Sequence, residues 1–214
     1  CSGLVGSEMC IRDRPNAVTR LTPPPDDEDR RDLILGAGRL TDVKRYDVLI
    51  RAFARLATDF PTWSLMICGE GPERPRLERL VAELGLGDRV SLPGPVIDIG
   101  AIYDTGRILG HSAAFEGFGL SVAEAILHDL VVVASASCPG VSELVETGST
   151  GMLVDEHGDA VGAFEHGLRA MIVDPPSEKD RRAGARRLAE AYHPDRIVDP
   201  VSYTHLRAHE TATY

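Results

Sequence analysis

Six short apolar runs are spaced along the middle of the chain, at intervals that leave room for a helix between most of them. Helical spacing is clear after the first run, where Leu49, Ile50, Phe53 and Leu56 keep one face. Nearly continuous apolar strands separated by helices are typical of a parallel sheet that is covered on both faces. The sequence therefore predicts an α/β domain built on a doubly wound parallel sheet. The expected strands comprise residues 33–37, 63–68, 89–92, 107–110, 131–134 and 152–154.

The same periodicity indicates further helices later in the chain. Apolar residues keep one helical face at residues 77–84 and, more briefly, at residues 122–126. The last part of the expected domain, residues 159–174 and 178–192, is also helical in pattern and rich in Arg and Ala. We expect these last two helices to pack outside the sheet.

The charge balance narrows the classes of function. The chain has 23 Lys and Arg against 33 Asp and Glu, a net charge of −10, and it contains no basic run. A nucleic-acid surface needs a basic face, so we predict no nucleic-acid partner. No apolar stretch approaches the roughly 20 residues that cross a bilayer, so we predict no membrane span. The 4 cysteines lack metal-ligand spacing, which favours a reducing, cytoplasmic location without a zinc site.

The two chain ends differ from the middle. Residues 7–14 and 201–211 resemble translated sequencing-adapter read-through, and we interpret both ends as non-native tails. Residues 22–29 are rich in Pro and Asp, a composition that predicts a linker. The expected boundaries are a tail at 1–14, a linker at 15–31, the folded domain at 32–198 and a second tail at 199–214.

The loops after the strands are the first place to look for function, because doubly wound sheets bind ligands at the carboxyl ends of their strands. The loop after the first strand contains Gly36-Ala37-Gly38 but lacks the third glycine of a dinucleotide fingerprint, which argues against nicotinamide binding. This loop carries Arg39 and Lys44, two cations that are suited to holding a diphosphate. The alternative interpretation makes both of them solvated surface charges.

The strongest signal is the run Glu116-Gly117-Phe118-Gly119-Leu120, followed by Glu124. Glu116 is expected in a loop and Glu124 in the first turns of the next helix, so both face one crevice. The glycines let backbone amides approach a ligand, and free amides at a helix start suit an anion. Carboxylates suit sugar hydroxyls, so the run fits a sugar joined to a phosphate. The alternative is an exposed loop residue and a carboxylate stabilised by the helix dipole.

Taken in order, these motifs resemble the donor half of the retaining nucleotide-sugar glycosyltransferases of the GT-B fold, which has two Rossmann-like halves. The resemblance covers almost all of residues 15–198, and the order and spacing of the motifs are specific. It implies a Rossmann-like donor domain preceded by an interdomain linker at 15–31. The matching motifs are Pro15-Asn16-Ala17-Val18, Gly38-Arg39-Leu40 with Lys44, residues 47–53, residues 69–72, Asp88-Arg89-Val90, residues 116–120 with Glu124, and Pro139-Gly140 with Glu143.

The resemblance implies a role for each matching side chain at the crevice. Arg39 and Lys44, next to Gly38, are expected to bind the donor diphosphate, and Glu124 to accept hydrogen bonds from the ribose hydroxyls. Glu116 is expected to face the transferred sugar and is the candidate catalytic residue. The resemblance implies transfer with retention and without a bound metal or other cofactor.

Backbone groups complete the expected site. The segment at residues 94–96 is expected near the nucleotide base, and His111 is interpreted as a strand-end residue without a role. Glu143, Gly148 and Gly151 are interpreted as structural turn and cap positions. Backbone amides that are expected to contact the sugar and the phosphate belong to Gly117, Phe118, Gly119 and Leu120.

The resemblance also implies what else the parent protein contains. The family's other half, which supplies the acceptor site, precedes the donor half and is missing from this sequence. We therefore expect donor binding, from a UDP- or GDP-sugar, without transfer by this chain alone. Polysaccharide or glycolipid assembly, a family expectation, would place the full-length enzyme peripherally at the cytosolic face of a membrane. The alternatives are a fragment of a nucleotide-sugar epimerase and a non-catalytic module that binds a nucleotide sugar.

Overall fold

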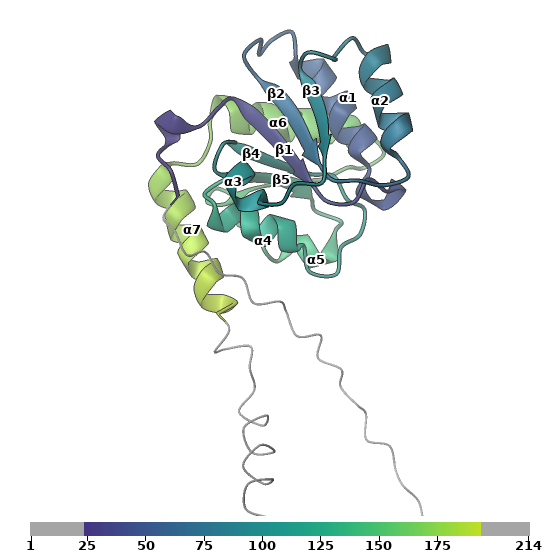
Figure 1. Cartoon of the computed structure of the whole chain (residues 1–214). Coiled ribbons are helices and arrows are strands. Elements are labelled where there is room, and N and C mark those ends of the chain that lie inside the picture. The colour runs from purple at the N-terminus through teal and green to yellow at the C-terminus, as the bar shows by residue number, and fades with distance from the viewer. Residues whose placement is uncertain (1–23, 194–214) are drawn as a thin grey trace, which may run out of the picture.

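The computed structural model describes residues 24–193, so the predicted tails at 1–14 and 199–214 lie outside the described residues. A six-stranded sheet runs through the described part in the order β3-β2-β1-β4-β5-β6, and every pairing in it is parallel (Figure 1). The predicted Rossmann-like α/β architecture is therefore confirmed. The strands are β1 (Leu33–Ala37), β2 (Ser64–Cys68), β3 (Val90–Gly94), β4 (Ile108–His111), β5 (Val131–Ser135) and β6 (Gly151–Val154).

Helices cover both faces of the sheet (Figure 1). One face carries α1 (Tyr46–Leu56), α2 (Arg74–Glu83) and α6 (Ala160–Val173), whose buried apolar residues share one core cluster. Residues of the helices on the other face share a second cluster. These are α3 (Ile99–Tyr103), α4 (Leu120–Leu127), α5 (Pro139–Ser142) and α7 (Glu178–Ala191). Two short 3-10 turns, η1 (Asp27–Asp29) and η2 (Asp42–Lys44), precede β1 and α1.

Helix α1 shows how the sequence pattern produces the packing. Leu49, Ile50, Phe53 and Leu56 recur at helical spacing, and all four are fully buried against the sheet. Removing one such side chain from water contributes about 1.5–3 kcal/mol to the free energy of folding. The apolar stripe therefore fixes the rotation of α1 and, with it, the direction in which the loop before the helix points.

The prediction for residues 159–174 is wrong in one respect. Helix α6 lies on the sheet, where Phe164 and Leu168 are fully buried beside the β4 and β5 side chains Ile108 and Val133. The spacing Phe164, Leu168, Met171 forms an apolar stripe that must be buried, and the sheet face is the surface that accepts it. Helix α7 does pack outside the sheet, against α4.

The described part of the predicted linker is bound to the domain. Arg30 is buried and donates hydrogen bonds to the carbonyl oxygens of Gly106 at 2.7 Å and His128 at 2.6 Å. Arg181 on α7 donates to the Asp27 carboxylate at 2.6 Å. The packed structure therefore begins several residues before β1.

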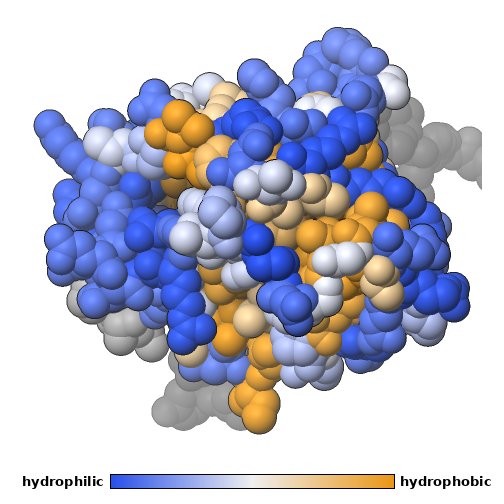
Figure 2. Space-filling model, turned by 90° about the horizontal axis from the view of Figure 1, so that it is seen from above, coloured by the Kyte–Doolittle hydropathy of each residue, from blue (hydrophilic) through white to orange (hydrophobic). Residues whose placement is uncertain are grey.

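The described surface is largely hydrophilic at its periphery in the view from above, with apolar residues gathered toward the middle (Figure 2). Of the helices within residues 24–193, none is long and apolar enough to cross a bilayer. Four of the exposed large apolar side chains belong to segments at the carboxyl ends of the strands. These four are Val43, Ile97, Phe115 and Leu120.

The loops after β1 and β2 are held in close contact by a glycine. Gly69 follows β2 with φ of 149°, and a Cβ atom there would lie 1.9 Å from the carbonyl oxygen of Gly38. Gly38 in turn donates its backbone N–H to the carbonyl of Cys68 at 3.0 Å. Only a residue without a side chain fits at position 69, so the floor of the crevice at this sheet edge depends on it.

Replacing Gly69 by alanine is expected to lower the free energy of unfolding by about 2–4 kcal/mol, because the new methyl group meets backbone atoms and the conformation disfavours an L-residue. Urea denaturation measures this loss. Gly87→Ala is the matched control, since a Cβ there meets no atom within 4 Å. Equal stability of the two variants would contradict the close approach of the two loops.

Candidate functional site

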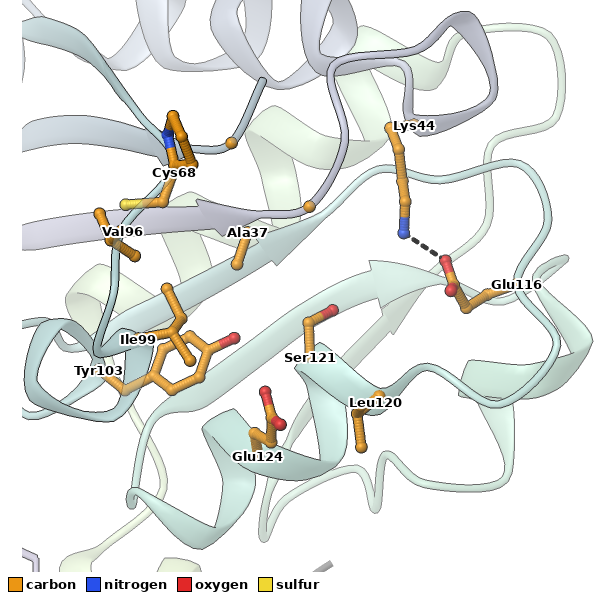
Figure 3. Close-up of a pocket in the computed structure, with 13 residues that line it drawn as sticks. Ala37, Lys44, Cys68, Val96, Ile99, Tyr103, Glu116, Leu120, Ser121 and Glu124 are labelled. Atoms are coloured by element: carbon orange, nitrogen blue, oxygen red, sulfur yellow. Dashed lines mark hydrogen bonds and ion pairs between the residues drawn. The ribbon is translucent and has the colours of Figure 1, made fainter. Parts of the chain in front are cut away.

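A cleft of about 380 Å³ lies at the carboxyl ends of β1, β2 and β4 (Figure 3). The strand order reverses between β1 and β4, and doubly wound sheets bind ligands at such a point. The cleft therefore lies where the sequence predicted it. Its lining residues are Ala37, Gly38, Lys44, Cys68, Gly69, Pro95, Val96, Ile99, Tyr103, Glu116, Leu120, Ser121 and Glu124.

An ion pair joins the two sides of the cleft. The ammonium group of Lys44, at the end of η2, donates a short hydrogen bond to Glu116 in the loop after β4 (Figure 3). The side chains are 15% and 25% exposed, respectively, so solvent screens the pair only in part. The loops after β1 and β4 are thus tied together by one cation and one anion.

The imidazole ring of His111 lies close to the same carboxylate. It ends β4, it is buried, and its Nε2 lies 3.7 Å from Glu116 Oε2, which is too long for a hydrogen bond. Neither ring nitrogen has a hydrogen-bond partner within residues 24–193. His111 first and then Lys44 lower the pKa of Glu116 to about 2, against the opposing effect of burial. Glu116 is therefore a carboxylate at neutral pH.

The N-terminus of α4 opens onto the cleft. Gly119 precedes the helix with φ of 67°, a left-handed conformation that turns the chain sharply into α4. Leu120 and Ser121 occupy the first helical positions, where backbone N–H groups have no carbonyl from a preceding turn. Both residues line the cleft, so the site combines free amides with the positive end of a helix dipole.

Glu124 lies one turn further along α4, on the same face as Leu120 (Figure 3). Burial raises its pKa, in contrast to Glu116. Its side chain has no hydrogen bond or ion pair with any residue that the structure describes. A desolvated carboxylate without a partner is suited to accept hydrogen bonds from ligand hydroxyls.

The structure brings part of the predicted site together. Gly38, Lys44, Glu116, Leu120 and Glu124 line the same cleft. The roles predicted for them stay predictions.

The other predicted residues lie beside the cleft. Arg39 is exposed, and its side chain has no hydrogen bond or ion pair within the described residues. Gly117 and Gly119 shape the loop, while Phe118 packs edge-on against Tyr192 at 5.2 Å between ring centroids.

Several lining residues were missed by sequence reasoning. Ile99 and Tyr103 come from α3, a helix too short to show a periodic signal. The Tyr103 hydroxyl is buried without a partner within residues 24–193, and burial raises the pKa of this phenol, so it remains a neutral hydrogen-bond donor. Val96 belongs to the segment predicted near the base. Ser121 lies between Leu120 and Glu124 of the quoted motif, so the sequence could have pointed to it.

A family model described as Glycosyl transferases group 1 matches residues 22–188. Among curated proteins, an uncharacterized glycosyltransferase of Haemophilus influenzae is 30% identical over 166 residues, which make up 78% of this chain and 46% of that protein. A 4-alpha-N-acetylgalactosaminyltransferase of Campylobacter jejuni, acting on a diphospho-undecaprenol-linked saccharide by its name, is 31% identical over 171 residues, 79% of this chain and 46% of that protein. The chain thus spans less than half the length of these relatives.

Solved structures share the fold. The pneumococcal O-GlcNAc transferase GtfA, in complex with UDP and GlcNAc, superposes with a TM-score of 0.78 at 23% identity, covering 88% of this chain and 38% of that one. The C-terminal domain of a group 1 glycosyl transferase from Francisella tularensis gives a TM-score of 0.63 at 22% identity, covering 78% of this chain and 92% of that one. The described fold is therefore that of a domain found in GT-B glycosyltransferases.

Glu116→Gln is expected to destabilise the protein in a pH-dependent way. Because the folded-state pKa is about 2 and the ordinary value is 4.5, the ionised side chain stabilises the fold fully above pH 4.5. This contribution, at most about 3 kcal/mol before screening, is lost as pH falls from 4.5 toward 2. Urea denaturation from pH 7 to pH 3 measures the difference between wild type and variant. Glu190→Gln, at an exposed site on α7, controls for surface charge. A difference that does not shrink in acid would contradict the ion pair.

Proposed function

The chain belongs to the group 1 glycosyl transferases, and on that premise we propose that its cleft binds the nucleotide-sugar donor of a retaining transferase. The donor is a UDP- or GDP-sugar, and the acceptor is a hydroxyl group held by a separate half of the full-length protein. In this proposal the present domain is the donor half, which binds the donor but transfers nothing by itself.

One observation carries the proposal. Within a single cleft, Lys44 and the free amides of α4 face Glu116 and Glu124, so positive and negative groups are both available to one ligand. A nucleotide sugar has the matching pattern, with an anionic diphosphate between two groups rich in hydroxyls. A simple phosphate would leave Glu124 without a hydrogen-bond donor, and a neutral sugar would leave the free amides of α4 without an anion.

The proposed pose follows from these charges. The diphosphate lies against the amides of Leu120 and Ser121, with Lys44 and the exposed Arg39 as its cations. The ribose places its hydroxyls on Glu124, and the base extends toward Val96. The sugar to be transferred then faces Glu116, the candidate catalytic residue.

This arrangement favours the departure of the nucleotide. When the bond between the anomeric carbon and the diphosphate oxygen breaks, negative charge grows on the diphosphate. Fixed amides stabilise that charge without reorganising, and Lys44 adds a positive charge on the same side of the cleft; one such donor contributes about 10²-fold or more to a rate. The acceptor oxygen then forms the new bond to the anomeric carbon, and its proton passes to the departing diphosphate oxygen. Within residues 24–193, no group of three or more His, Cys, Asp or Glu residues is arranged to hold a metal ion.

The solved neighbours favour testing the uridine nucleotide first. GtfA was solved with UDP and GlcNAc, and an Anabaena protein, HepE, with UDP and glucose. Membership of the transferase family argues against the epimerase alternative. A binding module without catalysis stays as the second candidate, because a donor-binding half and such a module require the same cleft.

Glu124→Gln is expected to weaken the binding of UDP or GDP about 10- to 100-fold, because charged hydrogen bonds to the ribose contribute about 1.5–3 kcal/mol. The same change is expected to leave the stability equal or higher, since burial raises the Glu124 pKa and the charge costs free energy in the unliganded fold. Titration calorimetry gives the affinity, and thermal unfolding gives the stability. Glu83→Gln, an exposed position on α2, is the control. Unchanged affinity would refute the ribose contact.

The present chain is expected to produce no transfer product when UDP- and GDP-sugars are supplied with simple acceptors, because the acceptor half is required for the reaction. Mass spectrometry of the acceptors checks this. Turnover by this chain would contradict the proposal that transfer requires a separate acceptor half. If joining the chain to the preceding half of a relative still yields no activity, the binding-module alternative is favoured.

A further inference from the structure

The backbone at Lys44 is held by contacts with the segment that follows β4, the strand next to β1. Its carbonyl oxygen accepts a hydrogen bond from the Ser112 hydroxyl at 2.8 Å, and the carbonyl of Val43 accepts one from the Ala114 amide at 2.9 Å. The segment that carries Lys44 after β1 therefore lies directly on the segment that follows β4.

The next residue, Arg45, extends this attachment to the segment that follows β6. Its Nε donates to the Ser112 carbonyl at 2.8 Å, after β4. Its two terminal nitrogens fork onto Glu156, with distances of 2.7 and 2.6 Å to the two carboxylate oxygens. Glu156 follows β6. One guanidinium group thus connects the segments that follow β1, β4 and β6.

The geometry of this pair is demanding. Arg45 has φ of 48°, a left-handed conformation that costs an L-residue about 1 kcal/mol or more. The Arg45 and Glu156 side chains are only 24% and 16% exposed. Although burial opposes it, Arg45 and Ser135 hold the pKa of Glu156 below its ordinary value, so the pair is ionised at neutral pH. Strain at Arg45 persists because a bidentate, partly buried bond compensates for it.

We propose that Arg45 and Glu156 are positioning residues for Lys44: their ion pair fixes the loop that presents the Lys44 ammonium group to the donor diphosphate. Neither side chain lines the cleft, so neither contacts the ligand. The claim about the diphosphate rests on the proposed function, whereas the claim about Lys44 does not. An ion pair on the β6 side of the sheet therefore sets the affinity of a cleft beside β1.

The sequence offers a direct readout of Lys44. It contains two lysines, Lys44 and the exposed Lys179, so limited acetylation compares a paired, largely buried amine with an internal reference. Arg45→Gly removes the fork but tolerates the left-handed backbone, and Glu156→Gln keeps the volume but loses the charge. Glu165→Gln is the matched control, because it breaks another pair between α1 and α6, with Arg55 at 3.3 Å.

The expected result is a several-fold rise in the acetylation of Lys44 relative to Lys179 in Arg45→Gly and Glu156→Gln, and no change in Glu165→Gln. Peptide mass spectrometry gives the ratio, and thermal unfolding verifies that each variant folds. An unchanged ratio in both variants would overturn the proposal, whatever the protein binds.

The ligand arm uses UDP and GDP in titration calorimetry. Glu156→Gln is expected to lower the affinity for the nucleotide that the wild type binds about tenfold. In a Lys44→Met background the same change is expected to alter the affinity less than twofold, because the ion pair acts through Lys44. A tenfold loss of affinity in the Lys44→Met background would show that the ion pair affects binding through other residues, and it would refute an action through Lys44. If wild type binds neither nucleotide while acetylation still rises, the proposed function fails but the positioning of Lys44 stands.

Discussion

The reversal of strand order between β1 and β4 is the constraint on which the site depends. These strands are neighbours, yet the chain leaves β1 toward β2 and leaves β4 toward β5, so their loops diverge and open a cleft. The ion pair between Lys44 and Glu116 spans that opening. Each of the two side chains comes from a different half of the sheet, so the pair exists only when both halves have folded.

The two glutamates of the cleft have opposite environments although they are eight positions apart. Glu116 faces a lysine and a histidine, which lower its pKa, whereas Glu124 faces the apolar wall of the cleft, and burial raises its pKa. Carboxylates whose pKa values are pushed apart in this way have different roles in a site. Glu116 already has Lys44 as its ion-pair partner, whereas Glu124 can accept hydrogen bonds from a ligand.

Much of the fold follows from local pattern. The strand from Leu33 to Ala37 was predicted with its observed bounds. A run of five residues without a polar side chain is typical of a strand that is buried on both faces of a doubly wound sheet. Short helices gave no such signal, so α3 and its cleft residue Tyr103 were missed. The placement of α6 was wrong, since a periodic stripe shows that a helix is buried but not against which surface.

The sequence by itself determined the α/β class, the strand positions and the motif that carries Glu116 and Glu124, because these depend on periodicity and on residues close together in the chain. Only the tertiary structure decided that Lys44 pairs with Glu116, that His111 lies beside them, and that Arg45 reaches Glu156. Those partners are up to 111 residues apart. Their meeting depends on which strands are neighbours, and residue spacing along the chain carries no record of that order.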